Sequence, residues 1–374
     1  MTIKKFGILV SIMWLTLSSV NAQTADENKE ALEKDPAQEV LPEDNSAVSL
    51  DTEIIAPEEE SEYFVTSSGS GPYHFSLSPF LGLFHGWGEE ILYKYPKKDT
   101  YVSQLIWDLK PLCYAGLSFD FGPCDPLMNN GITATGTFKF GFPHKTGIME
   151  DRDWQYPDND KLTNYSHHDA FSLNAILVDL DAGYSWRLTD NFALKAYGEF
   201  SFMYLSWMSE DGYTQYLKSD STGNIIPDQT WDKDIPRTQI YGSGIRYTQS
   251  WFILSPAVSL LTKITERYFL EVNFSYSPLV YCFARDDHLR RDYIFWDEIY
   301  FGHHIRTGGK LILSLFKNLE FSFSLSYRYI TGFRGNSYYD DGTGTALKNI
   351  YDGGAKHSAF DVAIAAKFRL YGRD

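Results

Sequence analysis

Cysteine is scarce in this sequence of 374 residues, basic residues are outnumbered by acidic ones, and no long apolar run occurs after the first 22 residues. The three cysteines, Cys113, Cys124 and Cys282, show no spacing typical of a metal site or of a disulfide framework. A single Cys113–Cys124 bridge and apolar packing on strands both remain open. A net charge of −16 does not favour a nucleic-acid partner. No stretch beyond residue 22 approaches the roughly 18 apolar residues of a spanning helix, so any membrane span must consist of strands.

The first 22 residues have the features of a secretory signal peptide. Lys4 and Lys5 precede the apolar run Phe6 to Val20, and small residues follow up to Ala22. Residues 23–62 then contain fourteen acidic residues, two basic residues and no aromatic residue. Such a segment cannot bury a core, so it is predicted to be a disordered acidic linker, acting either as a solvated tether or as an acidic ligand. The folded domain is predicted to span residues 63–374.

From Tyr73 onward, apolar and polar residues alternate along segments that are rich in Tyr and Phe. The clearest run, Leu319 to Tyr329, has Leu, Phe or Tyr at every second position. Ten such segments can be counted: 73–87, 101–121, 132–143, 170–188, 191–207, 244–264, 267–283, 300–316, 319–331 and 358–371. A sheet with one face in lipid and the other in water has this pattern. Several segments exceed the 9 to 11 residues that a spanning strand needs, so the wall is predicted to extend beyond the membrane.

The joints between these segments alternate between short and long. Those after segments two, four, six and eight are short, as at Thr189–Asp190, and the others are long and polar, notably 207–243. Outer-membrane barrels have this plan, with tight periplasmic turns and extended extracellular loops. The sequence therefore predicts an all-β fold: a ten-stranded antiparallel transmembrane β-barrel with long extracellular loops. A soluble sandwich would also alternate, but it would need neither a signal peptide nor such regular asymmetry.

Asp286 and His288 lie just beyond one alternating segment, two residues apart. In an extended chain these side chains face the same way and Asp287 faces the other. A carboxylate in this position can fix the tautomer of the imidazole, which can then take a proton from water. A solvated acidic loop is the alternative interpretation of this stretch.

Asp151 and Asp153 form a second pair with the same spacing, in the joint after segment three. Carboxylates that share a face repel each other, so one can keep a raised pKa and hold a proton or a water between them. All long joints lie on one rim of the predicted barrel, so this pair and the Asp286–His288 pair can meet across its mouth.

Four short motifs, taken in chain order, resemble the omptins, the ten-stranded outer-membrane endoproteases. They are Val102-Ser103-Gln104-Leu105-x-Trp107, Asp151-x-Asp153-Trp154, Asn164-Tyr165 and Asp286-x-His288. The resemblance implies that His288 is the general base, oriented by Asp286, and that Asp151 and Asp153 hold and polarise the attacking water. It implies peptide or protein substrates, no metal or other cofactor, a monomer, and an active site on the extracellular side of the outer membrane.

The resemblance also implies acidic side chains that receive an Arg or Lys beside the cleaved bond. Glu90 stands where the family places one of them, but Ala284 stands at the position of the second. Glu89 is a possible substitute, and Arg285 would repel a cation if it turned inward. On the sequence alone, a preference for basic residues is predicted to be less exclusive than in the family.

Some omptins depend on outer-membrane lipid, which basic residues grip on the outer wall. This sequence has Tyr197 and Glu199 but Ser201 and Ser250 where the family has Arg, so any lipid dependence here is predicted to differ. The His167-His168 and His303-His304 pairs are predicted to be rim residues and not metal ligands, because adjacent residues of a strand point apart. The alternative function is a non-catalytic barrel, a porin or adhesin that retains omptin-like loops.

Overall fold

The computed structural model of the chain describes residues 73–94, 100–156, 160–219, 225–226, 229–316 and 318–370. This part is all-β, with fifteen strands in one antiparallel sheet. Its residues include no helix that is long and apolar enough to cross a membrane. The predicted signal peptide (1–22) and acidic linker (23–62) lie outside the described residues.

The strands differ widely in length. They are β1 (Tyr73–Tyr93), β2 (Tyr101–Pro123), β3 (Gly131–Gly141), β4 (His144–Asp153), β5 (Asn164–Thr189), β6 (Phe192–Tyr216), β7 (Thr238–Gln239), β8 (Ser243–Lys263), β9 (Tyr268–Ser277), β10 (Leu279–His288), β11 (Tyr293–Tyr300), β12 (Gly302–Phe316), β13 (Leu319–Gly332), β14 (Gly335–Asp340) and β15 (Leu347–Leu370). β5 has 26 residues and β6 has 25. Strands of more than twice the 9 to 11 residues that a membrane requires are therefore present, as predicted.

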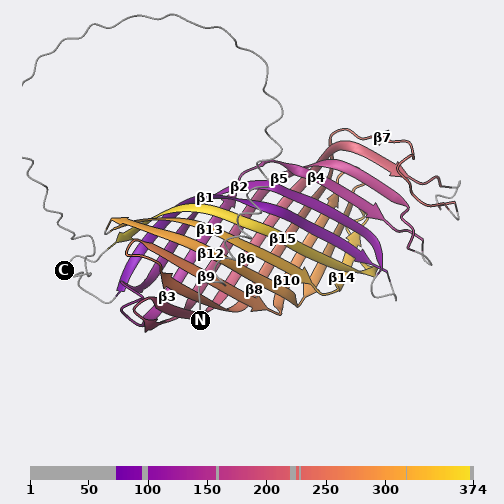
Figure 1. The fold of residues 1–374 in the computed structure, drawn as a ribbon. Helices are drawn as coiled ribbons and strands as arrows, with labels where there is room; N and C mark the ends of the chain where they lie inside the picture. Colours follow the sequence, from indigo (N-terminus) through magenta and orange to yellow (C-terminus); the bar gives the residue numbers. More distant parts are fainter. Residues whose placement is uncertain are drawn as a thin grey trace, which may run out of the picture. The chain divides into compact units, whose positions relative to one another are not determined.

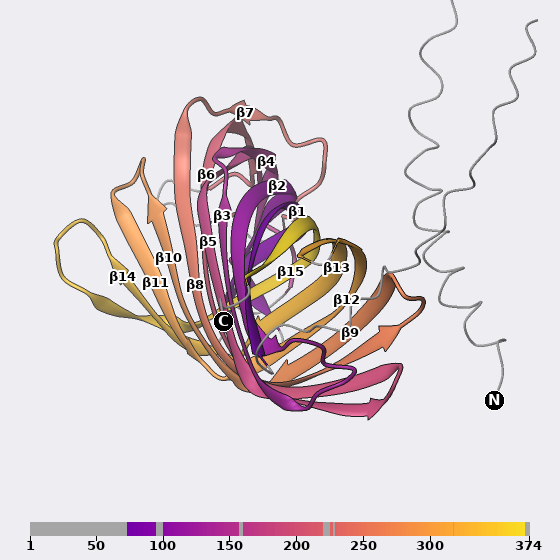
Figure 2. The same ribbon diagram turned by 90° about the vertical axis from the view of Figure 1, so that its left-hand side faces the viewer.

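The strand pairing runs in a closed ring. β1 pairs with β2 on one side and with β15 on the other, so the last strand returns to the first. Between them the pairing passes through β3 and β4, β5, β6, β8, β9 and β10, β11 and β12, and β13 and β14. Figures 1 and 2 show these strands in two views at right angles. Closure of this kind removes the long edges that would otherwise offer unpaired backbone groups to another chain.

Much of the chain predicted to be long loops consists of strands. β4, β7, β11 and β14, with the ends of β5, β6 and β10, fall largely in those regions. Several breaks between consecutive strands have a local cause: Pro143 and Pro278 cannot donate to the ladder, and Phe301 has a φ of 66°. The chain resumes pairing beyond each break, so the prediction of loops at these positions is wrong.

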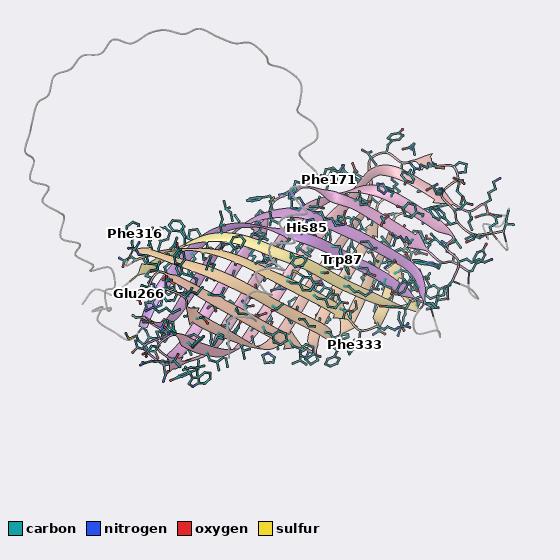
Figure 3. All side chains as sticks on the ribbon, viewed as in Figure 1. His85, Trp87, Phe171, Glu266, Phe316 and Phe333 are labelled. Carbon is teal, nitrogen blue, oxygen red and sulfur yellow. The ribbon has the colours of Figure 1, made fainter. Side chains whose placement is uncertain are left out.

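Exposed apolar side chains cover the outer face of the sheet along one half of its strands. Examples are Leu81, Ile132, Phe138, Leu180, Leu254, Val272, Phe323 and Ile364. Glu266, in the β8–β9 connection, and Phe316, the last residue of β12, lie toward one end of the sheet in Figure 3. β4, β7 and β14 lie toward the opposite end in Figure 1. The sheet therefore has an end with short connections and an end that carries the additional strands.

Charged side chains pair on the inner face of the apolar half. Arg306 contacts Glu199 at 3.1 Å and Asp179 at 3.6 Å, and Ser201 donates a hydrogen bond to Glu199 at 3.1 Å. Glu199 and Ser201 are thus buried inside the sheet, while the alternate residue Phe200 points the other way. The prediction that residues 199 and 201 belong to the outer lipid-binding wall is wrong.

A layer of buried aromatic rings, here called the aromatic floor, crosses the inside of the sheet. It lies between these charges and the end that carries the additional strands. It consists of Trp107, Trp207, Tyr247 and Trp251, all fully buried. Trp107 and Trp207 pack on Tyr247 with ring centroids 5.7 and 5.9 Å apart. Tyr247 pairs in register with Asp286 on β10, so the floor lies directly beside the predicted site.

Gln249 of β8 connects the floor to the opposite wall. Its Nε2 donates to the backbone carbonyl of Glu89 at 3.0 Å and to that of Lys356 at 3.2 Å, while its Oε1 accepts from Trp251 at 3.0 Å. Because both carbonyls belong to strands across the ring, these bonds tie its two sides together.

Cys113, exposed on β2, forms no disulfide, so the Cys113–Cys124 bridge that the sequence left open is absent.

Candidate active site

β10 carries Asp286 and His288 on its inner face, the face that the buried Ala284 also shares. His288 Nε2 lies 2.8 Å from Asp286 Oδ2, and the two side chains are 23% and 4% exposed. The ring of Phe295 on β11 contacts the imidazole edge-on, with centroids 5.3 Å apart. The carboxylate therefore holds one ring nitrogen and leaves Nδ1 available to exchange a proton.

Asp287 makes its contacts on the outer face of β10. Arg285 Nε donates to its Oδ1 at 2.7 Å, and Arg246 Nε donates to its Oδ2 at 2.9 Å. Arg285 is therefore paired on the side of β10 opposite to Asp286, and it does not turn inward to repel a substrate cation.

β4 carries Asp151 and Asp153 at its end, where it is paired with β2 and β5. Ser166 Oγ donates to Asp151 Oδ2 and Asn164 Nδ2 donates to Asp153 Oδ2, each at 3.4 Å. Ser103, from the first of the quoted motifs, pairs in register with Asp153 and also hydrogen-bonds to it. Asp151 Oδ1 is buried without a hydrogen-bond partner among the described residues. One carboxylate oxygen of this pair is thus free to accept a hydrogen bond from water or substrate.

The Asp151–Asp153 pair and the Asp286–His288 pair interact electrostatically. Burial raises the pKa of Asp151 well above its usual value, and the charges of Asp153 and Asp286 raise it further. Burial also raises the pKa of Asp153, against the hydrogen bonds just described and the charges of Arg291 and His288. These charge effects act between β4 and β10, the two strands that carry the predicted pairs.

Glu90 lies on β1 near the same carboxylates. Burial raises its pKa well above the usual range, and the charges of Asp286, Asp297 and Asp151 add to the effect. Its Oε2 is buried and has no hydrogen-bond partner in the described part of the chain. Glu90 is thus a carboxylate held among other acids.

Glu89 has different surroundings. Its Oε1 accepts a hydrogen bond from Gln104 at 2.6 Å and contacts Lys356 Nζ at 3.2 Å. Strand alternation places it on the face opposite to Glu90. Glu89 is therefore already neutralised and is not a substitute for the acid that Ala284 lacks.

Asp297 on β11 was not predicted as a site residue. It is 4% exposed, and its pKa is raised to about 7, mainly by burial and also by the charge of Asp286, against a hydrogen bond from Ser337. The region between segments seven and eight was predicted to be a loop, so the sequence pattern gave no reason to place residue 297 inside.

Replacing Asp297 by Asn is expected to stabilise the protein at pH 8 but not at pH 4. The folded carboxyl binds its proton up to about pH 7 and an unfolded one only up to about 3.9, so the stability of the native protein falls as pH rises between these values. Asn cannot ionise, and the gain at pH 8 is at most on the order of 4 kcal/mol. Urea unfolding of the refolded proteins measures it. A gain that is independent of pH would contradict this assignment.

The histidine pairs have separate partners. His303 Nδ1 lies 3.0 Å from the hydroxyl of Tyr276, and His304 Nδ1 lies 3.1 Å from the hydroxyl of Ser255. His167 stacks on Tyr213 with centroids 5.4 Å apart. No group of three or more His, Cys, Asp or Glu side chains is arranged to hold a metal ion in the part of the chain that the structure describes.

A model of the Omptin family matches residues 71–370, which include the whole described sheet. The chain belongs to the omptin family. This omptin shares its fold with the outer membrane protease OmpT from Escherichia coli, with a TM-score of 0.70 and 18% sequence identity over 82% of this chain and 99% of that chain.

Two other solved structures align with this omptin only loosely. The toluene transporter TodX from Pseudomonas putida gives a TM-score of 0.27 at 7% identity, covering 80% of this chain and 91% of that chain. A FadL homologue from Pseudomonas aeruginosa gives 0.25 at 8% identity, covering 79% and 90%. Scores this low support no conclusion about this omptin. A comparison with curated proteins found no match.

Proposed function

We propose that this omptin is an outer-membrane endopeptidase that hydrolyses peptide bonds with a water held between the Asp286–His288 and Asp151–Asp153 pairs. The observations that carry the proposal are the 2.8 Å hydrogen bond between His288 and Asp286 and the buried Oδ1 of Asp151, which has no hydrogen-bond partner among the described residues. The fold shared with an outer membrane protease supports it.

The proposed reaction uses each group for one task. Asp151 and Asp153 accept hydrogen bonds from the water and orient it. His288 Nδ1 removes a proton as the water oxygen attacks the peptide carbonyl carbon, and Asp286 stabilises the imidazolium that forms. The same proton then passes to the leaving amine as the carbon–nitrogen bond breaks, which restores neutral His288. These steps require no metal ion or other cofactor.

The proposed setting is a monomeric ten-stranded transmembrane barrel. Ten strands result when β3 with β4, β9 with β10, β11 with β12 and β13 with β14 are each counted as one broken strand and the short β7 is left out. The exposed apolar half would lie in the outer membrane, with the short connections in the periplasm. The end that carries Asp151 and His288 would then face the outside of the cell.

Protease treatment of intact cells is expected to test this orientation. Cleavage should occur within residues 217–237, between β6 and β7, because the proposal places this connection outside the cell. The tight turn at Asp190 should stay intact in the periplasm. Mapping the fragments by mass spectrometry checks both sites. Cleavage at Asp190 in intact cells would reverse the orientation and place the carboxylates in the periplasm.

The alternative, a porin or adhesin, fits the interior less well. A porin needs an open lumen, whereas the aromatic floor and the Gln249 bonds cross the inside of this sheet. Incubating the refolded full-length chain with a peptide library, with and without a metal chelator and added outer-membrane lipid, tests the proposal. Chelator-resistant cleavage is expected. No cleavage under any of these conditions would favour the non-catalytic barrel.

A further inference from the structure

Ala284 and Asp297 are direct partners in the β10–β11 pairing. Side chains of directly opposed residues lie on the same face of a sheet, with Cβ atoms about 5 Å apart. Both are buried, at 2% and 4% exposed. A carboxylate missing from position 284 is thus present one strand away, on the same inner surface.

Asp297 belongs to the same acidic cluster as Glu90. The charge of Asp297 raises the pKa of Glu90, and the charge of Asp286 raises the pKa of both. Glu90 Oε2 and Asp286 Oδ1 are also buried without a hydrogen-bond partner among the described residues. Buried carboxylate oxygens are costly when unpaired, so a cation that enters among them is strongly favoured.

A glycine makes room for the Asp297 carboxylate. A Cβ at Gly353 on β15 would lie 2.1 Å from Asp297 Cγ and 2.3 and 2.4 Å from its two oxygens. Any larger residue at 353 must therefore displace this carboxylate. The missing side chain at Gly353 thus leaves room for Asp297 where it lies, beside Ala284 and facing the inside.

We propose that Asp297 supplies the second carboxylate of the pocket that receives a basic substrate side chain, and that Glu90 supplies the first. The inference rests on the proposed endopeptidase function and names its substrates: peptides with Arg or Lys beside the cleaved bond. Two carboxylates from different strands can hold one guanidinium or ammonium group by charge-assisted hydrogen bonds. On the sequence alone, Ala284 predicts weak discrimination between basic and neutral substrate side chains. With Asp297 in the pocket, strong discrimination is expected.

Two peptides that differ only in Arg or its neutral isostere citrulline before the cleaved bond provide the test. The refolded full-length chain is expected to prefer the Arg peptide strongly in kcat/KM. Asp297→Asn should lower the Arg-to-citrulline ratio about ten- to a hundredfold, the worth of one hydrogen bond to a charged group. Gly353→Ala should lower it as well, by displacing the carboxylate. In the Asp297→Asn background, Ala284→Asp should restore the ratio.

Glu298→Gln is the matched control, because Glu298 is adjacent to Asp297 in the chain but its side chain lies on the outer face. The Arg-to-citrulline ratio of this variant should equal that of the unmodified protein. If the unmodified protein prefers Arg and Asp297→Asn keeps that ratio within twofold, Asp297 is not part of the pocket, although the proposed function stands. If the unmodified protein cleaves the citrulline peptide equally well, the basic pocket itself is refuted. If it cleaves no peptide in the library, the proposed function fails and this inference fails with it.

Discussion

His288→Ala is expected to lower kcat/KM for peptide cleavage by about 10²- to 10⁴-fold, the usual cost of removing a general base. The imidazole is 23% exposed on the inner face of β10 and bonded to Asp286 through Nε2. Alanine removes the group that accepts the proton of the attacking water. The change should leave assembly intact, because the side chain lies at the end of its strand. Cleavage of a fluorogenic peptide by refolded protein measures the effect.

His167→Ala is the matched control. His167 is also a histidine of the strand ends beyond the apolar half, but it stacks on Tyr213 and not on the carboxylates. Its removal should change kcat/KM by less than about threefold, within the range expected for a group outside the chemistry. Near-normal turnover in His288→Ala would show that another group serves as the base, even though the family assignment and the fold would be unaffected.

The sequence predicted the ring-forming strands well where one face of the sheet is apolar. In runs such as Leu319 to Tyr329, every second side chain has to be apolar if the outer face lies against lipid, and β13 covers this run. The spacing of Asp286 and His288 likewise determined which side chains share a face. The hydrogen bond between them follows from that local geometry.

The extra strands β4, β11 and β14 could not be predicted in the same way. Polar residues lie on both faces of each of these strands, so the alternation that marks a lipid-facing strand is absent. Asp297 can be assigned to the inner face only from the pairing of β11 with β10, which sets it opposite Ala284. Local sequence patterns do not specify such long-range register.

The assignment of Ser201 failed for a related reason. Alternation determines that residues 199 and 201 share a face, but not which face it is. The buried partners Asp179 and Arg306 decide this, and they come from other strands. A shift of one residue exchanges the inner and outer faces of a whole strand, so a short motif alone does not establish which side chains meet lipid.

Asp151→Asn is expected to reduce kcat/KM by a similar factor of about 10²- to 10⁴-fold. Asn has nearly the same shape but cannot supply the negative carboxylate oxygen that orients the water and stabilises positive charge on His288. The isosteric change removes one of the buried charges that raise the pKa of Glu90, so folding should not suffer. Glu150→Gln is the control, since Glu150 bonds to Tyr165 at 2.7 Å and to Arg152 at 2.8 Å, away from the pair.

The double variant Asp151→Asn with His288→Ala tests whether the two pairs act on one water. If they do, the second substitution removes little that the first has not already removed, because groups that act as a unit give non-additive losses. The double variant should then be no more than about tenfold slower than the slower single variant. Losses that multiply in full would mean that the aspartates and the histidine contribute independently, and that no shared water connects them.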